Sequence, residues 1–559
     1  MAAVAERELR GTPAAPGAAI GAPWIHRPPS PGTTARRSLG EAASLAAAEV
    51  TALGGRLRDG GREAEAEILD AQAMMAGDPA LLDAAGKLVS SGADPAAAIV
   101  QAGEEVAATF EAIGDEYLAA RGADVRDVAA RIARHVTGAA APRLERRSVV
   151  VAGDLPPSVT VELDRALLAG IALEGGSRTS HAAILSRSLG IPAVVGLAGV
   201  CAAAEGAAAL GIDGDAGTVV LDPDAATVAR LEAVAAGTHE RAAADAELGS
   251  RELATADGHH VTCAANIGDP DEAEGAFAAG AEAIGLFRTE FAFAGRATEP
   301  DEAEQAAAYA RVLRAAGDAE VVVRLVDIGG DKPVPFLSLA PEANPFLGVR
   351  AIRLAARHPQ LLPTQVRAIL RASVDAGRPA SLMAPMVADE ADVDLLLDLV
   401  AAARAAVPDA PAPRVGIMVE VPSAVLLADR LAERVDFMSI GTNDLTQYLL
   451  AADRTNPELA ARQDPLHPAV LRAVAGIVAA ARAAPSCEVA VCGEMAGDPA
   501  GALLLVGLGV DELSMEPRCF GAVNRAVAAR TRPDLVALAE AAQSLPSADA
   551  VRASIGVVA

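Results

Sequence analysis

Lysine is nearly absent from this chain: among 559 residues it occurs only at Lys87 and Lys332. Asparagine is scarce as well, and aromatic residues make up 2% of the sequence. Much of the hydrophobic fraction of 52% is alanine, so that fraction overstates how strongly apolar the chain is. Because the composition is biased against lysine and asparagine, each lysine or asparagine that is present is a candidate for a functional role.

Cysteine is rare and its spacing fits neither a disulfide framework nor a zinc site. The chain has five cysteines, with no CxxC pair and no Cys/His cluster of metal-binding spacing. One of them remains a candidate for a reactive thiol. The five are Cys201, Cys263, Cys487, Cys492 and Cys519.

The chain also lacks the apolar runs that membranes and secretion require. No stretch has the ~20 strongly apolar residues of a membrane helix, and the N-terminus has no apolar signal-peptide core. A net charge of −27 argues against nucleic acid as a partner, because phosphate backbones attract cations. We therefore predict a cytoplasmic protein without membrane insertion. The charge favours a basic protein partner.

The first part of the chain predicts a small α/β unit interrupted by helices. Residues 11–25 are strand-like with turn signals, and residues 37–134 contain alanine-rich stretches of helical spacing. Short β-like and helical runs then alternate over residues 148–222. The predicted elements there are the strands Ser148–Ala152, Ala169–Leu173 and Thr218–Leu221 and the helix His181–Leu189.

The second part predicts a (β/α)8 barrel. A charged helix over about Ala225–Ala254 leads into eight strand-like runs, most of them separated by helical stretches. The runs are Val261–Ile267, Ala283–Phe287, Val321–Ile328, Ser381–Met386, Val415–Val419, Val435–Ile440, Val489–Cys492 and Val510–Ser514.

The polar residues lie where a barrel builds its active site, at the C-terminal ends of these runs. We therefore expect their side chains to converge on one mouth. The set is Asn266, Arg288, Glu290, Arg324, Asp327, Asp331, Lys332, Glu420, Asn443, Asp444, Cys492 and Glu494.

Their residue types suit phosphoryl transfer, in which positioning and electrostatics carry most of the catalysis. Arg288 and Arg324 can clamp phosphate or carboxylate oxygens. Glu420 and Asp444 are oxygen ligands suited to Mg²⁺. Structural ion pairs explain any one of these residues equally simply, but they explain the whole set poorly. Two further cations add positive charge: Lys332 and Arg454.

A histidine lies in a position that favours chemistry on its ring. Thr179 or Ser180 can cap a helix that begins near His181, which places the imidazole in the first turn. Free N–H groups and the helix dipole there favour an anion such as a phosphoryl group. A neutral imidazole is a competent nucleophile near pH 7. Taken alone, this histidine is as well explained by a capping turn.

The string GGSRTSHAAILSRSLGIPAVVG around His181 resembles the phosphohistidine signature of the phosphoenolpyruvate-utilising enzymes. Within that group the chain is similar to Enzyme I of the bacterial phosphotransferase system, and the similarity covers nearly the whole chain in the family's order. The other matching strings are GTPAAPGAAIG, ILDAQAMMAGDP, EYLAARGADVRDV, GLFRTEF, RLVDIGGDKP, NPFLGVRAIR, GIMVEVP, DFMSIGTNDLTQY and VCGEMAGD.

The resemblance implies a multidomain α/β protein. Residues 1–27 and 140–222 correspond to a swivelling phosphohistidine domain, and residues 28–139 correspond to an inserted helical subdomain that binds the carrier. Residues 223–254 correspond to a linker helix. The (β/α)8 barrel over residues 255–559 would bind phosphoenolpyruvate and form a homodimer.

The resemblance also implies a role for each matched residue. His181 accepts the phosphoryl group on Nε2, Cys492 protonates the enolpyruvate, and Glu420 and Asp444 bind Mg²⁺. Several residues match phosphoenolpyruvate contacts, the last of them less closely: Arg288, Arg324, Asn443, Asp444, Arg454 and Lys332. The histidine-containing carrier HPr would then collect the phosphoryl group from His181.

Two departures and several alternatives accompany this reading. Phe287 and Gln72 stand where many relatives have leucine and histidine; Gln72 bears on the carrier surface or on how His181 is held.

A pyruvate phosphate dikinase needs an ATP-binding domain, for which too little chain precedes His181. The nitrogen-regulatory Enzyme I and the dihydroxyacetone-kinase-linked phosphotransferases need a sensor or carrier domain. A non-catalytic regulator would have lost matched residues.

Overall fold

The computed structural model describes most of the chain in two compact units, residues 1–241 and 242–559. The described residues are 7–26, 36–59, 69, 72–111, 116–156, 159, 162–176, 181–293, 296, 298–332, 334–337, 339, 340, 342–454, 456, 459, 462–484 and 486–556. Each unit has its own hydrophobic core and is considered by itself.

An eight-stranded mixed sheet forms the base of the first unit, with strand order β1-β8-β7-β3-β4-β5-β6-β2. Strands β3 to β6 pair in parallel, and the strands that flank them pair antiparallel. The strands are β1 (Arg7–Arg10), β2 (Thr12–Ala15), β3 (Ala18–Ile25), β4 (Ser148–Ala152), β5 (Leu168–Leu173), β6 (Ala193–Val195), β7 (Leu210–Asp213) and β8 (Thr218–Leu221). Three strands were missed in the sequence: β1, β6 and β7.

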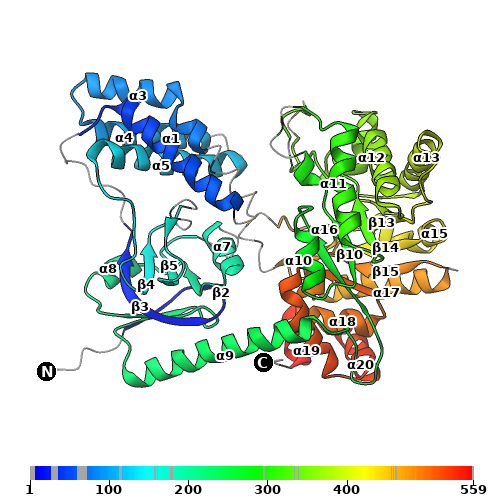
Figure 1. Ribbon diagram of the computed structural model, residues 1–559. Coiled ribbons are helices and arrows are strands. Elements are labelled where there is room, and N and C mark those ends of the chain that lie inside the picture. The colour runs from blue at the N-terminus through cyan, green and yellow to red at the C-terminus, as the bar shows by residue number, and fades with distance from the viewer. Residues whose placement is uncertain are drawn as a thin grey trace. The chain divides into compact units, whose positions relative to one another are not determined.

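Helices interrupt this sheet between β3 and β4, as the sequence predicts (Figure 1). They share an alanine-rich core in which small side chains allow close helix packing. The helices of the insertion are α1 (Leu39–Asp59), α3 (Pro79–Ser90), α4 (Pro95–Glu111) and α5 (Glu116–Thr137), and those of the sheet part are α7 (His181–Leu189) and α8 (Val200–Ala204).

A buried ion cluster joins the insertion to the sheet part. Arg131 of α5 has a side chain that is 3% exposed, and it bonds both Glu49 of α1 and Glu162, which precedes β5. Gln72 is buried and donates to Asp124. Because its side chain has no exposed surface, Gln72 does not belong to an exposed carrier surface.

The second unit is a closed barrel of eight parallel strands, which confirms the predicted (β/α)8 fold. Each of the eight predicted runs overlaps one strand. The strands are β9 (Thr262–Ile267), β10 (Ala283–Phe287), β11 (Val321–Arg324), β12 (Ser381–Ala384), β13 (Val415–Val419), β14 (Phe437–Ile440), β15 (Glu488–Val491) and β16 (Glu512–Met515).

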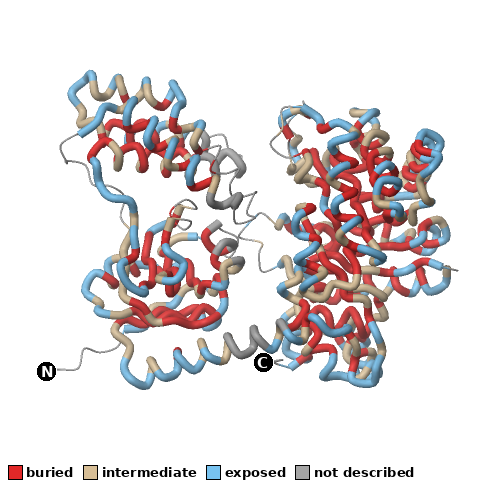
Figure 2. Tube along the Cα trace, in the orientation of Figure 1, coloured by how far each residue is buried: buried red, intermediate tan, exposed pale blue. Residues whose placement is uncertain are grey.

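Helices surround this barrel, and their inner faces and the strands form one large core, which appears as the continuous buried region in Figure 2. The α-helices are α10 (Glu272–Ala278), α11 (Glu302–Ala315), α12 (Leu361–Ala376), α13 (Glu390–Ala406), α14 (Pro422–Leu426), α15 (Ala428–Ala432), α16 (Thr442–Leu450), α17 (Pro468–Ala483), α18 (Pro499–Leu508), α19 (Phe520–Ala528), α20 (Arg532–Ala542) and α21 (Ala548–Ile555). The short 3-10 helices are Glu290–Ala292, Pro345–Leu347, Ala351–Ala356, Glu494–Gly497 and Pro517–Cys519.

The long charged helix α9 (Ala225–Gly249) is shorter than predicted, since the sequence suggested residues 223–254. The chain leaves the helix at Gly249, and Leu253 is buried in the barrel core. Ala254 then forms an antiparallel bridge with His260. Among the described helices, none is long and apolar enough to cross a bilayer.

Candidate functional site

The predicted polar residues lie at the C-terminal ends of the barrel strands. Arg324 is the last residue of β11, Glu420 follows β13, and Cys492 follows β15. Asn443 and Asp444 lie in the first turn of α16, directly after β14. Parallel strands bring these ends to one face, and the contacts below connect most of the set.

Arg324 is held in place by carboxylates around it. Its Nη2 donates to Glu290 Oε1 at 2.7 Å, and the backbone N–H of Asp327 donates to the same oxygen at 2.8 Å. The side chain is 9% exposed. Arg324 Nε and Glu290 Oε2 are buried and have no hydrogen-bond partner in the described part of the chain. Glu290 therefore fixes the orientation of the Arg324 guanidinium.

Asp327 is the centre of a dense group of cations. Its Oδ2 accepts from Lys332 Nζ at 2.6 Å and from Arg350 Nη2 at 2.6 Å, and its Oδ1 accepts from Arg350 Nε at 2.9 Å. Burial would raise the pKa of Asp327, but Lys332, Arg324 and Arg350 outweigh it and hold the pKa well below its usual range. Asp327 therefore stays ionised and fixes the ammonium group of Lys332 near the mouth.

Arg350 and Arg454 connect this group to Asp444. Arg350 Nη2 lies 3.3 Å from Asp444 Oδ2, and Arg454 Nη1 lies 3.1 Å from Asp444 Oδ1. The Arg454 guanidinium also lies over the ring of Phe346, 5.3 Å from its centroid, and its backbone N–H donates to Gln447. Asp444 Oδ1 is buried and accepts no hydrogen bond of good geometry from a described residue.

Glu420 faces Asp444 from the neighbouring strand end. It is 2% exposed and accepts the backbone N–H of Met386 at 2.8 Å. A Cβ at Gly441 would lie 2.7 Å from Glu420 Oε2, so glycine is required for this approach. Burial, followed by the charges of Asp444 and Asp327, raises the pKa of Glu420 well above its usual range. The charge of Asp444 therefore acts directly on the buried Glu420 carboxyl group.

Asn443 is fixed by a reciprocal pair of bonds. Its Nδ2 donates to Glu494 Oε1 at 3.2 Å, and its Oδ1 accepts from the backbone N–H of Glu494 at 3.0 Å. This pair ties the ends of β14 and β15 together beside Cys492.

Cys492 is a buried thiol, 3% exposed. Its Sγ lies 3.8 Å from the carbonyl oxygen of Ile440, and its own carbonyl accepts from Asn266 Nδ2 at 3.0 Å. Burial raises the pKa of Cys492 to about 11, although Ser439 and Arg324 oppose the shift. The thiol therefore carries its proton at neutral pH, which suits an acid.

Two predicted site residues are less fully determined. Arg288 follows β10 and is exposed; it is near enough for its charge to lower the pKa of Cys492, and no described side chain pairs with it. The helix α7 begins at His181, as predicted. The imidazole itself lies outside what the structure describes.

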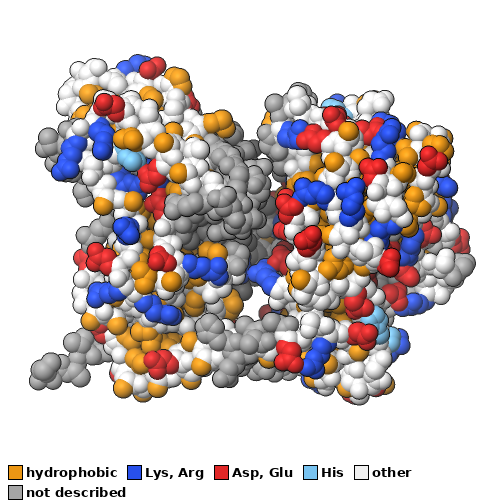
Figure 3. Space-filling view, viewed as in Figure 1, with side chains coloured by type: hydrophobic (Ala, Val, Ile, Leu, Met, Phe, Trp, Pro, Cys, Tyr) orange, Lys and Arg blue, Asp and Glu red, His pale blue; other side chains and the backbone are white. Residues whose placement is uncertain are grey.

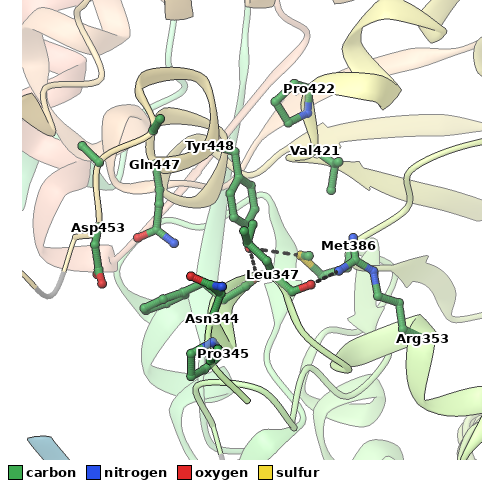
Figure 4. A pocket seen from close by; sticks show the side chains of 14 residues that line it. Asn344, Pro345, Leu347, Arg353, Met386, Val421, Pro422, Gln447, Tyr448 and Asp453 are labelled. Atoms are coloured by element: carbon green, nitrogen blue, oxygen red, sulfur yellow. Dashed lines mark hydrogen bonds between the residues drawn. The ribbon is translucent and has the colours of Figure 1, made fainter. Parts of the chain in front are cut away.

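A pocket of about 510 Å³ lies next to the carboxylate pair (Figure 4). Met386, which donates to Glu420, lies in its wall, and so does Gln447, which holds the backbone of Arg454. Tyr448 Oη donates to the carbonyl of Phe346 at 2.5 Å across the pocket. The pocket wall thus supports residues of the barrel mouth.

Sequence reasoning missed Arg350. It is the largest fully buried side chain and bonds Asp327, Asp331 and Asp444. Its motif, NPFLGVRAIR, was noticed only as a resemblance. The available signal was an arginine inside a Pro- and Gly-marked loop that carries no other charge until Arg353.

Three family models together match most of the chain. Residues 242–532 match the PEP-binding domain of PEP-utilising enzymes, residues 10–121 match their N-terminal domain, and residues 144–217 match their mobile domain.

Similar proteins include two with different names. The chain is 41% identical over 463 residues to the phosphoenolpyruvate-protein phosphotransferase of Bacillus subtilis (strain 168). This match covers 81% of this chain and 80% of that protein. It is 42% identical over 499 residues to the multiphosphoryl transfer protein of Xanthomonas campestris pv. campestris. That match covers 88% of this chain but only 59% of the longer relative.

Proposed function

This chain belongs to the phosphoenolpyruvate-protein phosphotransferases, the Enzyme I family of the phosphotransferase system, and we propose that it performs that reaction with the residues described above. In this proposal phosphoenolpyruvate binds at the barrel mouth. Its phosphoryl group passes to His181 and then to a histidine of HPr, and pyruvate is released.

One observation supports this assignment of roles most strongly. Arg324, Lys332, Glu420, Asp444 and Arg454 lie at or after the C-terminal ends of β11, β13 and β14. The contacts of Asp327 and Asp444 join most of them into one network. The network places cations around a pair of carboxylates. A phosphorylated carboxylic acid needs this combination.

Each cation contributes a different contact to phosphoenolpyruvate. Arg324 binds the substrate through its guanidinium, which Glu290 holds in a fixed orientation. Lys332 is a point charge suited to a phosphate oxygen. Arg288, Arg454 and the amide of Asn443 complete the proposed contacts, and Arg288 is exposed.

Mg²⁺ fits the pair Glu420 and Asp444. Asp444 Oδ1 is buried and accepts no hydrogen bond of good geometry from the described residues, although Arg454 Nη1 lies 3.1 Å from it. Burial, followed by the charge of Asp444, raises the pKa of Glu420. No described group of three or more His, Cys, Asp or Glu side chains has metal-binding geometry. Protein sites often hold Mg²⁺ with one or two carboxylates plus substrate oxygens. When bound, the ion would neutralise charge on the substrate.

Separate residues of this chain then carry out the phosphoryl transfer and the protonation. The bond between the phosphorus and the enol oxygen breaks, and His181 Nε2 takes the phosphoryl group. The N-terminal turn of α7 stabilises the added charge through its free N–H groups. Cys492 gives its proton to the methylene carbon of the enolate, which makes pyruvate.

Two partners belong to the same proposal. A net charge of −27 favours a basic carrier face, and acidic and basic side chains are interspersed on the face that Figure 3 shows. We assign HPr docking to the helical part of residues 28–139. We also propose a homodimer formed through the barrel, over residues 255–559, which sedimentation at several concentrations tests.

The experiment is labelling with ³²P-phosphoenolpyruvate and Mg²⁺ in the absence of ATP. The expected label is acid-labile and base-stable, and it moves to HPr on addition of the carrier. His181→Ala should abolish it, while the matched variant His358→Ala should keep it. Label that appears only with ATP would instead indicate a dikinase, and no label under any condition would indicate a regulator.

A further inference from the structure

A group of buried polar side chains lies in the wall of the barrel, behind the strand ends that carry the proposed substrate site. Four of these side chains, here called the wall network, are at most 1% exposed. They are Thr289, which follows β10, Gln305 and Tyr309 of α11, and Gln365 of α12. Helices α11 and α12 pack against each other outside the strands (Figure 1). Polar groups buried this deeply destabilise a core unless they are hydrogen-bonded, and here they are.

Gln365 is the centre of the wall network, and both ends of its amide are used. Its Nε2 donates to Thr289 Oγ1 at 2.9 Å and to Tyr309 Oη at 3.1 Å. Its Oε1 accepts the backbone N–H of Val326 at 2.9 Å. Because that N–H can only donate, it determines which end of the amide is the oxygen.

The direction of the remaining bond follows from this orientation. Since Thr289 Oγ1 accepts from Gln365, its own proton is available, and it is donated to the backbone carbonyl oxygen of Arg324 at 2.9 Å. Gln365 on an outer helix is therefore connected through one hydroxyl to the backbone of a residue that we assign to substrate binding.

These bonds lie where β11 leaves the barrel sheet, since Arg324 is its last residue. Two residues later, the N–H of Val326 donates to the side chain of Gln365. The N–H of Asp327 donates to Glu290 at 2.8 Å. Side chains thus hold three backbone groups in four successive residues, at the point where pairing between strands no longer fixes the chain.

This segment carries groups that the proposed function uses. Arg324 is a proposed phosphoenolpyruvate contact, and Asp327 accepts from Lys332 Nζ at 2.6 Å. A side chain moves with its backbone, and a misplacement of about 1 Å can cost about 100-fold in activity. The position of the segment is therefore as important as the charges on it.

We propose that Thr289 and Gln365 are positioning residues for phosphoenolpyruvate. They hold the backbone from Arg324 to Asp327 so that the Arg324 guanidinium and the Lys332 ammonium group meet the substrate in one fixed arrangement. Both act through Arg324 and Asp327 and not by contact with the substrate. The inference rests on the proposed role of Arg324 in substrate binding.

The alternative is that the wall network only stabilises the packing of α11 and α12, and the chain contains a matched control for it. Gln305 is also buried, at 1% exposed. It donates to the carbonyl of Pro300 at 2.9 Å and accepts from Tyr309 at 3.1 Å. None of its described hydrogen bonds reaches the segment that follows β11.

The test is the affinity for phosphoenolpyruvate, measured by calorimetry with Mg²⁺ in a His181→Ala background that cannot pass the phosphoryl group to this residue. Gln365→Met keeps the side-chain volume and removes all three bonds, so affinity should fall at least about 10-fold. Gln305→Met should lose similar stability in urea unfolding, yet its affinity should stay within about 2-fold of the parent.

Thr289 provides a second pair of variants that disturbs the core less. Thr289→Val keeps the shape but loses the hydroxyl, and should weaken phosphoenolpyruvate binding at least about 10-fold. Thr289→Ser keeps the hydroxyl and should stay within about 2-fold of the parent. Mg²⁺ affinity without substrate should be unchanged in both variants, because the proposed ligands Glu420 and Asp444 follow other strands.

Parental affinity in folded Gln365→Met or in Thr289→Val would overturn the proposal, since the wall network would then be structural only. Equal losses of affinity in Gln365→Met and Gln305→Met would overturn it as well, and so would loss of Mg²⁺ binding in Thr289→Val. Arg324→Met checks the proposed function separately. If that variant binds phosphoenolpyruvate like its parent, the assignment of Arg324 is wrong, which differs from a failure of positioning alone.

Discussion

Arg350 donates two hydrogen bonds to Asp327, from Nε to Oδ1 at 2.9 Å and from Nη2 to Oδ2 at 2.6 Å. Neither side chain is more than 1% exposed. The same guanidinium reaches Asp331 at 2.9 Å and Asp444 at 3.3 Å. One buried cation thus fixes the carboxylate that orients Lys332 and contacts a carboxylate that we assign to Mg²⁺.

Removing Arg350 should destabilise the barrel strongly. Arg350→Met leaves Asp327 buried with less compensating charge, and breaking a buried ion pair costs about 3–5 kcal/mol. Urea unfolding would measure the loss. The exposed-loop control is Arg353→Met, which removes only hydrogen bonds to backbone carbonyls and should cost about 1 kcal/mol. Equal costs for the two variants would contradict the buried network.

Glu420→Gln should separate metal binding from stability. The substitution removes one of two repelling carboxylates, so the metal-free variant should melt at or above the wild-type temperature. The Mg²⁺-induced rise in melting temperature should disappear, with Mg²⁺ affinity by calorimetry at least about 10-fold weaker. A variant that melts lower and still binds Mg²⁺ normally would place the ion elsewhere.

Cys492→Ala should slow pyruvate formation by about 10²–10⁴-fold, the usual contribution of a general acid. The KM for phosphoenolpyruvate should change little, since the thiol acts on the reacting carbon and not on substrate binding. Cys487→Ala removes a buried thiol with no proposed role and should keep normal kinetics. A normal kcat in Cys492→Ala would refute the proton-donor assignment.

Glu512 should make the protein less stable as the pH rises. Its pKa is about 8 in the folded chain and 4.5 for an unperturbed glutamate, the value expected after unfolding, so the folded state binds the extra proton between these values. Wild type should therefore lose about 1–3 kcal/mol relative to Glu512→Gln as the pH rises from 5 to 9. Denaturant unfolding across that range tests the sign. A constant difference between the two would contradict the raised pKa.

The sequence predicted the barrel well because periodicity and position are local signals. Every predicted run overlaps a barrel strand, and Glu420, Asp444 and Cys492 lie just after strand ends as expected. The α/β part was predicted less completely. Its missed strand β6 is only three residues long, and β1 precedes the predicted strand-like stretch.

What the sequence did not predict depends on contacts between distant residues. Arg350 acquires its importance from Asp327 and Asp444, which lie 23 and 94 residues away. Such residues carry no local pattern.

The central claim is that phosphoenolpyruvate phosphorylates His181. The most direct measurement is tandem mass spectrometry of the protein after incubation with phosphoenolpyruvate and Mg²⁺, at a pH that preserves phosphohistidine. The account predicts one phosphorylated residue, His181, at the start of α7. A phosphoryl group on any other of the eight histidines, with His181 unmodified, would contradict it.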